Sequence, residues 1–213
     1  LRLVTAVIEQ DLDRVHALLA AGIDVNTTRA DGATALLWAA HWGDLDTVDD
    51  LLRAGADPNA ADDHGVTPLD RAAENASPTV VDRLLLAGAD PTTAQTSGLT
   101  PLMTAARTGN SDAVRSLIDA GADVNVVEET RGQTALMWAV AQGQHAVVDL
   151  LIADGADVTA RSKVRPRLMH ADNTNAGQYD SGIIWNRGGF TPLLFAARHG
   201  DIESARRLLG AGA

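Results

Sequence analysis

The sequence contains no cysteine, has only four tryptophans, two phenylalanines and one tyrosine among 213 residues, and lacks any long apolar run. Without cysteine the chain forms neither disulfides nor thiolate metal sites, and the redox state of its compartment stays open. A segment of about 18 apolar residues, which a membrane-spanning helix needs, is missing, and so is a signal-peptide pattern. We therefore expect no membrane insertion. Because the chain begins with Leu1, we expect a trimmed protein, whose location is either cytoplasmic or exported.

Acidic residues outnumber basic ones throughout most of the chain. There are 28 Asp and Glu against 17 Lys and Arg, which gives a formal net charge of −11 at pH 7. A protein that binds nucleic acid usually carries a basic surface, because phosphate contacts supply most of the affinity. Nucleic acid is therefore not an expected partner.

No pattern typical of a catalytic, metal or cofactor site is recognisable. The six histidines are scattered, and none stands in a Ser-His-Asp or His-x-x-x-His arrangement. Glycine-rich nucleotide-binding loops are also missing. His170 and Asp172 give only a weak metal signal, because two ligands in a loop do not make a site. We expect no enzymatic activity and no cofactor.

What the sequence has in abundance is internal repetition, and this determines how its other features are interpreted. The phrase Gly-x-Thr-Pro/Ala-Leu begins at five glycines, spaced by 33, 33, 34 and 57 residues: Gly32, Gly65, Gly98, Gly132 and Gly189. A second phrase, Gly-Ala/Ile-Asp-Val/Pro-Asn/Thr, begins at five others, spaced by 33, 33, 33 and 34 residues: Gly22, Gly55, Gly88, Gly121 and Gly155. The last step of the first phrase therefore contains 57 − 33 = 24 extra residues, which lie between Gly155 and Gly189.

Each repeat is predicted to form two short antiparallel helices, as the segment 98–125 illustrates. Thr100 can cap the first helix, and Pro101 follows at the first helical position, where its missing N–H costs nothing. Gly109 ends that helix, and Asn110 or the next residue begins the second, whose apolar residues recur at helical spacing. Gly121 supplies the left-handed stop. No repeat can bury its apolar side alone, so stacking must provide the core.

These phrases resemble the consensus of the ankyrin-repeat family, G-x-T-P-L-H-x-A-A-x-x-G followed by L-L-x-x-G-A-D-V-N. The resemblance covers nearly the whole chain outside the insertion and is closer to bacterial members of the family. It implies an all-α solenoid in a single domain, 1–213, with a partial first and a partial last unit. The expected units are about 1–28, 29–61, 62–94, 95–127, 128–160 and 185–213, with an insert at about 161–188.

Two departures from the family pattern stand out. The histidine of the consensus is replaced in every repeat, by Leu37, Asp70, Met103, Met137 and Leu194. The hydrogen bonds that this histidine makes in the family therefore do not carry over. In addition, Ala76 replaces the usual glycine between the two helices of its repeat.

The few aromatic residues are unevenly distributed. None lies on a predicted second helix. Trp38, Trp138 and Phe195 share one repeat position, and Trp42 stands one helical turn after Trp38. Trp38 and Trp138 fit core packing and partner contact equally well. Core packing stays open for both because aromatics at helical spacing are often part of the core. For Trp42, near the end of its helix, contact is the favoured interpretation.

The insertion reverses the charge of the rest of the chain. Residues 161–188 contain five basic and two acidic residues, 5 − 2 = +3, whereas the remainder carries 12 − 26 = −14. Such a loop either folds back onto the acidic groove, meets an acidic partner, or is simply mobile. Its apolar content favours an ordered, functional insert. We expect the run Ile183 to Asn186 to be the second strand of an extended hairpin.

The resemblance implies a module that binds a protein or peptide on a concave face formed by first helices and hairpin tips, and we expect it to be a monomer. The groove residues predicted from the rows of first-helix positions are Trp38, His41, Trp42, Arg71, Arg107, Trp138, Gln142, Phe195 and His199. The predicted contact residues of the insert are Arg165, Arg167, Tyr179, Trp185 and Arg187. Two alternatives stay open: a small-ligand or glycan receptor in which the insert closes over a Trp-lined groove, and a structural scaffold.

Overall fold

In every repeat after the first, the first helix begins with a threonine whose side-chain oxygen accepts a hydrogen bond from the backbone N–H three residues further on. At oxygen–nitrogen distances of 3.2 to 3.4 Å, these caps are Thr34, Thr67, Thr100, Thr134 and Thr191. Each cap satisfies one of the backbone donors that a helix start leaves free. Pro68, Pro101 and Pro192 follow directly, in the first helical turn. The repeated phrase of the sequence is therefore a helix-initiation signal.

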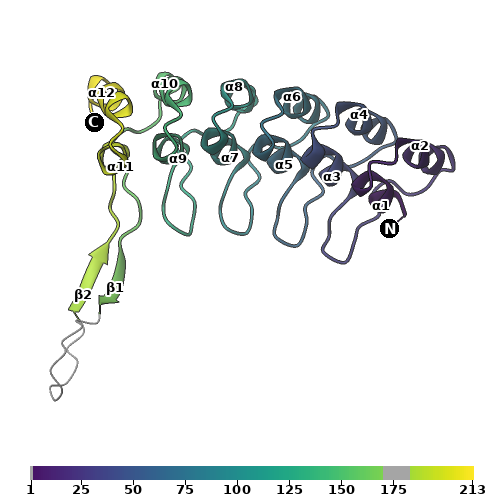
Figure 1. The fold of residues 1–213 in the computed structure, drawn as a ribbon, viewed down its shortest axis with the longest axis horizontal. Coiled ribbons are helices and arrows are strands. Elements are labelled where there is room, and N and C mark those ends of the chain that lie inside the picture. The colour runs from purple at the N-terminus through teal and green to yellow at the C-terminus, as the bar shows by residue number, and fades with distance from the viewer. Residues whose placement is uncertain (1, 170–182) are drawn as a thin grey trace, which may run out of the picture.

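A computed structural model describes the backbone of residues 2–169 and 183–213 and the side chains of 2–165 and 188–213. Within these residues the chain forms twelve helices in six pairs, which stack side by side (Figure 1). The first helices of the pairs are α1 (Arg2–Ile8), α3 (Ala35–Trp42), α5 (Pro68–Glu74), α7 (Pro101–Thr108), α9 (Ala135–Ala141) and α11 (Pro192–His199). The second helices are α2 (Leu12–Ala20), α4 (Leu45–Arg53), α6 (Pro78–Leu86), α8 (Ser111–Asp119), α10 (His145–Ala153) and α12 (Ile202–Gly210). The predicted solenoid of stacked helix pairs is confirmed.

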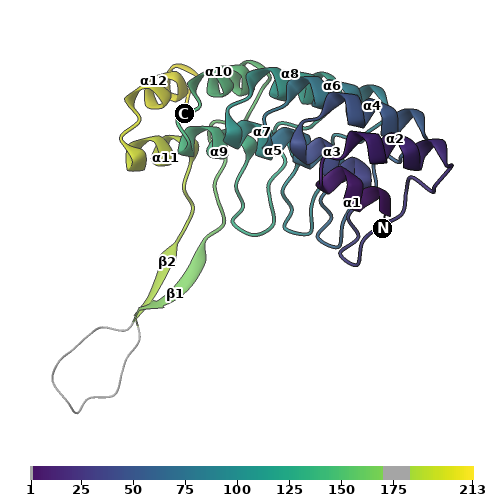
Figure 2. The same cartoon turned by 45° about the vertical axis from the view of Figure 1, so that its right-hand side comes forward.

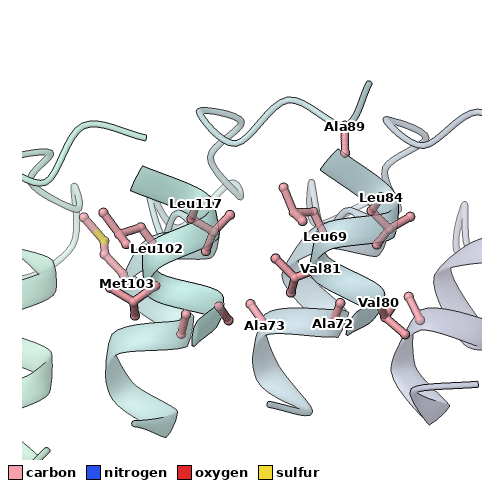
Figure 3. Packing of buried hydrophobic residues seen from close by; sticks show 14 of the residues in the cluster. Leu69, Ala72, Ala73, Val80, Val81, Leu84, Ala89, Leu102, Met103 and Leu117 are labelled. Carbon is pink, nitrogen blue, oxygen red and sulfur yellow. The ribbon is translucent and has the colours of Figure 1, made fainter. Parts of the chain in front are cut away.

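The core is a continuous layer of small and aliphatic side chains that runs through the stack. Each first helix packs against the first helices of the repeats beside it. Figure 3 shows two neighbouring repeats, in which Leu69 and Leu84 of one and Leu102 and Leu117 of the next are all buried. Alanine pairs such as Ala72 and Ala73, also fully buried, let adjacent helices approach closely. No single repeat has a core of its own, so each depends on its neighbours.

The turn between the two helices of a pair uses a residue with a positive φ angle in every repeat. At four of these positions the residue is glycine, and the other two are Gln10 at 56° and Ala76 at 54°. L-residues other than glycine adopt this left-handed conformation at a cost, because Cβ crowds the carbonyl oxygen. Ala76 thus keeps the turn geometry that the family's glycine normally provides.

The enlarged connector closes with the same backbone hydrogen bond as a short one. In a short loop the N–H of Asp62 donates to the carbonyl of Val66 over 3.0 Å. In the enlarged loop the N–H of Ser162 donates to the carbonyl of Phe190, also over 3.0 Å, and the N–H of Gly189 donates back to Ser162. The insertion therefore begins and ends at a fixed closing bond, and the helices on both sides stay in step.

Beyond this closing bond the insertion forms a two-stranded antiparallel hairpin. Strand β1 (Arg165–Met169) pairs with β2 (Ile183–Arg187), and Arg165 lies opposite Arg187. The predicted returning strand at Ile183 to Asn186 is confirmed. Both views show the hairpin pointing away from the helices, on the side where the shorter loops lie (Figure 2).

A candidate binding face and its basic pocket

The first helices and the loops beneath them form one side of the stack, which we call the inner face (Figure 1). Most of the predicted groove residues lie here with some solvent exposure. Trp42, Arg107, Gln142 and His199 are exposed, whereas Trp38, His41, Arg71 and Trp138 are partly buried. Phe195 is 8% exposed and belongs to the core cluster. The predicted groove residues therefore range from exposed side chains to a buried core residue, and only some of them are available for binding.

Three rings from α3 form a cluster in the second repeat. The centroid of Trp38 lies 5.5 Å from that of His41 and 6.3 Å from that of Trp42, and the His41 and Trp42 centroids are 4.9 Å apart. The guanidinium of Arg29, from the preceding loop, lies 6.0 Å from the Trp38 ring. Trp38 packs against the core, while Trp42 remains 43% exposed. The cluster thus holds one large exposed aromatic ring on a rigid base.

The middle of the inner face carries charges that neutralise one another. Glu74 of α5 forms an ion pair with Arg71 at 2.8 Å and a longer one with Arg107 of the next repeat at 3.8 Å. Together with Trp138 these residues border a hollow of about 180 Å³. Asp70 lies beneath it, and burial raises the pKa of its carboxyl, although hydrogen bonds from Thr67 and Gln95 partly offset this. This region offers no excess charge to a ligand.

A larger pocket of about 700 Å³ lies at the base of the hairpin, between α9 and α11. Its apolar side is formed by Trp138, Phe190 and Phe195, and the two phenylalanine rings are 5.6 Å apart. Its polar side is basic: the twelve lining residues include Arg131, Lys163, Arg165, Arg198 and His199, and no acidic residue. Gly188 completes the wall where the hairpin passes. The pocket combines an aromatic floor with a positively charged rim.

Two of the arginines are positioned by aromatic rings. The guanidinium of Arg131 lies 5.9 Å from the centroid of Trp138, and that of Arg198 lies 5.8 Å from the centroid of Phe190. Such cation–π contacts orient a guanidinium while leaving its N–H donors free for another acceptor. Lys163 is tied to the preceding loop through the carbonyl of Glu129, which accepts from its Nζ, and through its own N–H to Arg131.

The sequence alone identified only part of this pocket. It named Trp138, Phe195, His199 and Arg165, all of which line it, but it missed Arg131 and Arg198. Arg167 lies on β1, and Trp185 and Arg187 lie on β2. For these three residues the structure describes the backbone only. Tyr179 falls outside the described residues.

Two histidines join neighbouring repeats on the opposite side of the stack. His16 of α2 contacts Asp50 of α4, and His145 of α10 contacts Asp201 at the start of α12, each over 2.9 Å. Each pair links a second helix to the next second helix or to its N-cap residue, so a structural role accounts for both histidines. Within residues 2–169 and 183–213, no three His, Cys, Asp or Glu side chains come together as a metal site would require.

Comparison with protein families identifies the architecture. The family model described as ankyrin repeats (3 copies) matches residues 3–95 and 71–162, and the model described as ankyrin repeat matches residues 188–213. These matches cover most of the sequence and leave out the hairpin insertion. The chain belongs to the ankyrin-repeat family, whose members generally mediate protein–protein interactions.

A search of curated proteins gave no match to this sequence. Among the helices that the structure describes, none has the length and apolar character needed to cross a membrane.

Proposed function

We propose that this chain is a non-enzymatic, monomeric module that binds a protein or peptide through its inner face and the base of the enlarged hairpin. The observation that carries this proposal is Trp42, which is 43% exposed although its ring contacts His41 and Trp38. Tryptophan is enriched at the hot spots of protein interfaces. Because the cluster already orients Trp42, its binding loses little side-chain entropy.

The arrangement of the remaining inner face supports an extended partner. Trp138 borders both the basic pocket and the hollow next to Arg71 and Arg107, so the two depressions adjoin along the row of first helices. A polypeptide can follow such a row, with side chains entering successive depressions. The rigid stack presents this surface without refolding, which limits the entropic cost of association.

A second candidate function is a receptor for a small ligand or glycan. The volume of the basic pocket, about 700 Å³, lies within the range of about 300–1,000 Å³ that is usual for small-molecule sites. The pocket shares Trp138 with the hollow beside Arg71 and Arg107, and this continuation along the row of first helices favours a polypeptide over a small ligand. The third candidate, a purely structural scaffold, accounts for Trp38 and Trp138, which pack against the core, but not for Trp42.

Site-specific photocrosslinking tests the proposal. Benzoylphenylalanine placed at Trp42 is compared with the same group at Leu86, which is 84% exposed on the second helix α6 and is therefore a matched position on the opposite side. Both proteins are irradiated in lysate of the source organism, and adducts are identified by mass spectrometry. We expect a discrete set of polypeptide adducts from position 42 and none of them from position 86.

Two results would contradict the proposal. The first is an identical set of adducts from both positions, which would mean nonspecific contact. The second is an absence of polypeptide adducts at position 42 together with retention of a small molecule by the intact protein in native mass spectrometry. That second result would favour the ligand-receptor function instead.

A further inference from the structure

The cations of the basic pocket differ from the others on the inner face because no acidic side chain pairs with them. Elsewhere Arg29, Arg71 and Arg107 each form an ion pair with Asp31 or Glu74. In the part of the chain that the structure describes, no ion pair involves the four cationic rim residues, Arg131, Lys163, Arg165 and Arg198. In a chain with a net charge of −11, four neighbouring unpaired cations are a localised exception.

For Arg198 the cause lies in a single position of the repeat. Five residues after the conserved leucine, successive repeats carry Ile8, His41, Glu74, Arg107, Ala141 and Arg198. Arg107 therefore lies next to Glu74 of the preceding repeat and pairs with it at 3.8 Å. The corresponding neighbour of Arg198 is Ala141, which is small and uncharged. Ala141 consequently leaves both a space and an uncompensated charge, and it lines the pocket.

The apolar side of the pocket restricts what can neutralise this charge. Trp138, Phe190 and Phe195 form a surface that a hydrated inorganic ion does not cover. A ligand that fits both sides carries an anionic group for the rim and an adjoining apolar or aromatic side chain for the floor. Arginine guanidinium groups bind carboxylates through paired N–H donors.

We infer that the basic pocket is the docking site for an acidic peptide segment of the partner protein, with one or more carboxylates at the rim and an apolar side chain on the floor. This inference rests on the proposed function and names the partner chemistry at one end of the inner face. A nucleic acid is disfavoured because the chain outside residues 161–188 carries a charge of 12 − 26 = −14, which repels an extended polyanion. A short acidic segment contacts only the positive pocket and therefore avoids most of this repulsion.

Two sets of variants test the site. Arg131→Gln and Arg198→Gln remove rim charges, whereas Ala141→Glu places an acid beside Arg198, as Glu74 stands beside Arg107. Ala146→Glu is the matched control, because it adds the same charge to the same repeat on the exposed side of α10. Arg206→Gln is the control for charge removal, since Arg206 lies exposed on α12. Thermal melting of each variant verifies folding.

The binding probe comes from a display library of short random peptides selected on the wild-type protein. Selected peptides are synthesised with a fluorophore, and their affinity is measured by anisotropy. We expect them to contain Asp or Glu next to an aromatic or aliphatic residue. Each Arg→Gln change at the rim should weaken binding about tenfold, because a hydrogen bond between charged groups is lost. Ala141→Glu should weaken binding at least as much, because the new carboxylate would pair with Arg198 in place of the peptide. The two control variants should bind as the wild type does, and added salt should weaken all complexes.

Several outcomes would overturn the inference. Selected peptides without acidic residues, or equal binding to the wild type and to Arg131→Gln, Arg198→Gln and Ala141→Glu, would exclude an acidic segment in this pocket. Benzoate that competes as strongly as the best peptide would show that the pocket takes a free small carboxylate instead. Loss of peptide binding in Trp42→Ala but in none of the pocket variants would sink this inference and leave the proposed function intact. A library that yields no binding peptide would count against both.

Discussion

The rings of Trp38 and Trp42 lie 6.3 Å apart, yet only Trp38 is packed against the core. Replacement of each by alanine should therefore have different effects on the free energy of unfolding. We expect Trp38→Ala to cost about 2 to 4 kcal/mol, as truncation of a large core side chain does. Trp42→Ala should cost less than about 1 kcal/mol, because its ring is 43% exposed. Urea denaturation followed by circular dichroism measures both, and equal losses would place Trp42 in the core and remove it as a binding residue.

The difference between these two tryptophans shows what the sequence can predict. Their positions on the first helix followed from the repeat phrase, because caps such as Thr34 and turns such as Gly43 are local signals. Their burial depends on what the neighbouring repeats place beside them, and a single repeat does not contain that information. For this reason core packing and partner contact were equally acceptable for Trp38 from its spacing alone.

The basic pocket was predictable only in part for the same physical reason. The charge of the insertion indicated Arg165, and the aromatic row indicated Trp138. Arg131 and Arg198 lie outside the insertion and carry no signal individually. Both line the pocket, and Arg198 has Ala141 at the position where Arg107 has Glu74 as its ion-pair partner. A comparison of equivalent positions across repeats, rather than a motif search, is the method that finds such a site.

A second prediction concerns a chain of asparagines that joins consecutive loops. The amide of Asn59 donates to the carbonyl of Gly88 over 2.9 Å, and its oxygen accepts from the N–H of Asp90 over 2.8 Å. At the equivalent position of the next repeat stands Thr92, whose hydroxyl bonds to Asp90 of its own repeat instead. We expect Asn59→Ala to destabilise the protein by about 2 kcal/mol, the net value of two hydrogen bonds.

The reciprocal variant makes this prediction sharper. Thr92→Asn should restore the missing link between the third and fourth repeats and raise stability by about 1 kcal/mol. Differential scanning calorimetry of both variants, with Asn59→Thr as an intermediate, provides the measurement. If Thr92→Asn lowers the melting temperature, the asparagine links contribute nothing net and the prediction is wrong.

A third prediction uses the positive φ angle of Ala76. Its value of 54° lies in the left-handed region, which costs an L-residue roughly 1 to 2 kcal/mol relative to glycine. Part of this is offset because glycine loses more backbone entropy on folding. Ala76→Gly should therefore stabilise the protein by about 0.5 to 1 kcal/mol in urea denaturation.

The equivalent turn one repeat earlier supplies the control. Gly43 has a φ of 67°, and an added Cβ would meet only Ser77, at 3.5 Å, which is an ordinary contact. Gly43→Ala should thus lose about 1 kcal/mol through the backbone alone. Opposite signs for the two substitutions are the expected result; the same sign for both would mean that something other than φ controls this turn.

A fourth prediction follows from the buried carboxyl of Asp70, whose pKa is raised mainly by burial. In the window between the unfolded pKa of about 3.9 and the raised folded pKa, the folded state binds more protons than the unfolded state. Stability from this group is therefore present at low pH and is lost as pH rises through the window. Asp70→Asn removes that loss, so the variant should gain on the wild type as pH rises above the unfolded pKa of about 3.9 and through the raised folded pKa.

Asp90 provides a control of opposite sign. Hydrogen bonds from Thr92 lower the pKa of its carboxyl, so its contribution is present above the unfolded pKa and is lost as pH falls. Asp90→Asn should therefore lose stability relative to the wild type at neutral pH, and the difference should shrink in acid. Urea midpoints at several pH values measure both variants. A difference between Asp70→Asn and the wild type that does not vary with pH would show that Asp70 does not titrate in this window.

The fifth prediction concerns the hairpin as a whole, because its closing bond separates it from the helices. Replacing Val164–Gly188 with a single histidine produces Ser-Lys-His-Gly, which mirrors the short loop from Asp62 to Gly65. The bond from Ser162 to Phe190 can still form, and a shorter loop costs slightly less entropy to close. We expect the urea midpoint to change by less than the equivalent of about 1 kcal/mol.

Binding should respond in the opposite way, because the replacement removes Arg165 and Gly188 from the pocket wall and exposes its aromatic floor. The shortened protein should keep its circular dichroism spectrum and its melting temperature while losing most of its affinity for the peptides selected on the wild type. A fall of many degrees in melting would instead identify the hairpin as a brace for the last repeat. Because the shortened protein keeps Lys163 and its bonds to Glu129 and Arg131, such a fall would have to come from contacts of the residues that are removed.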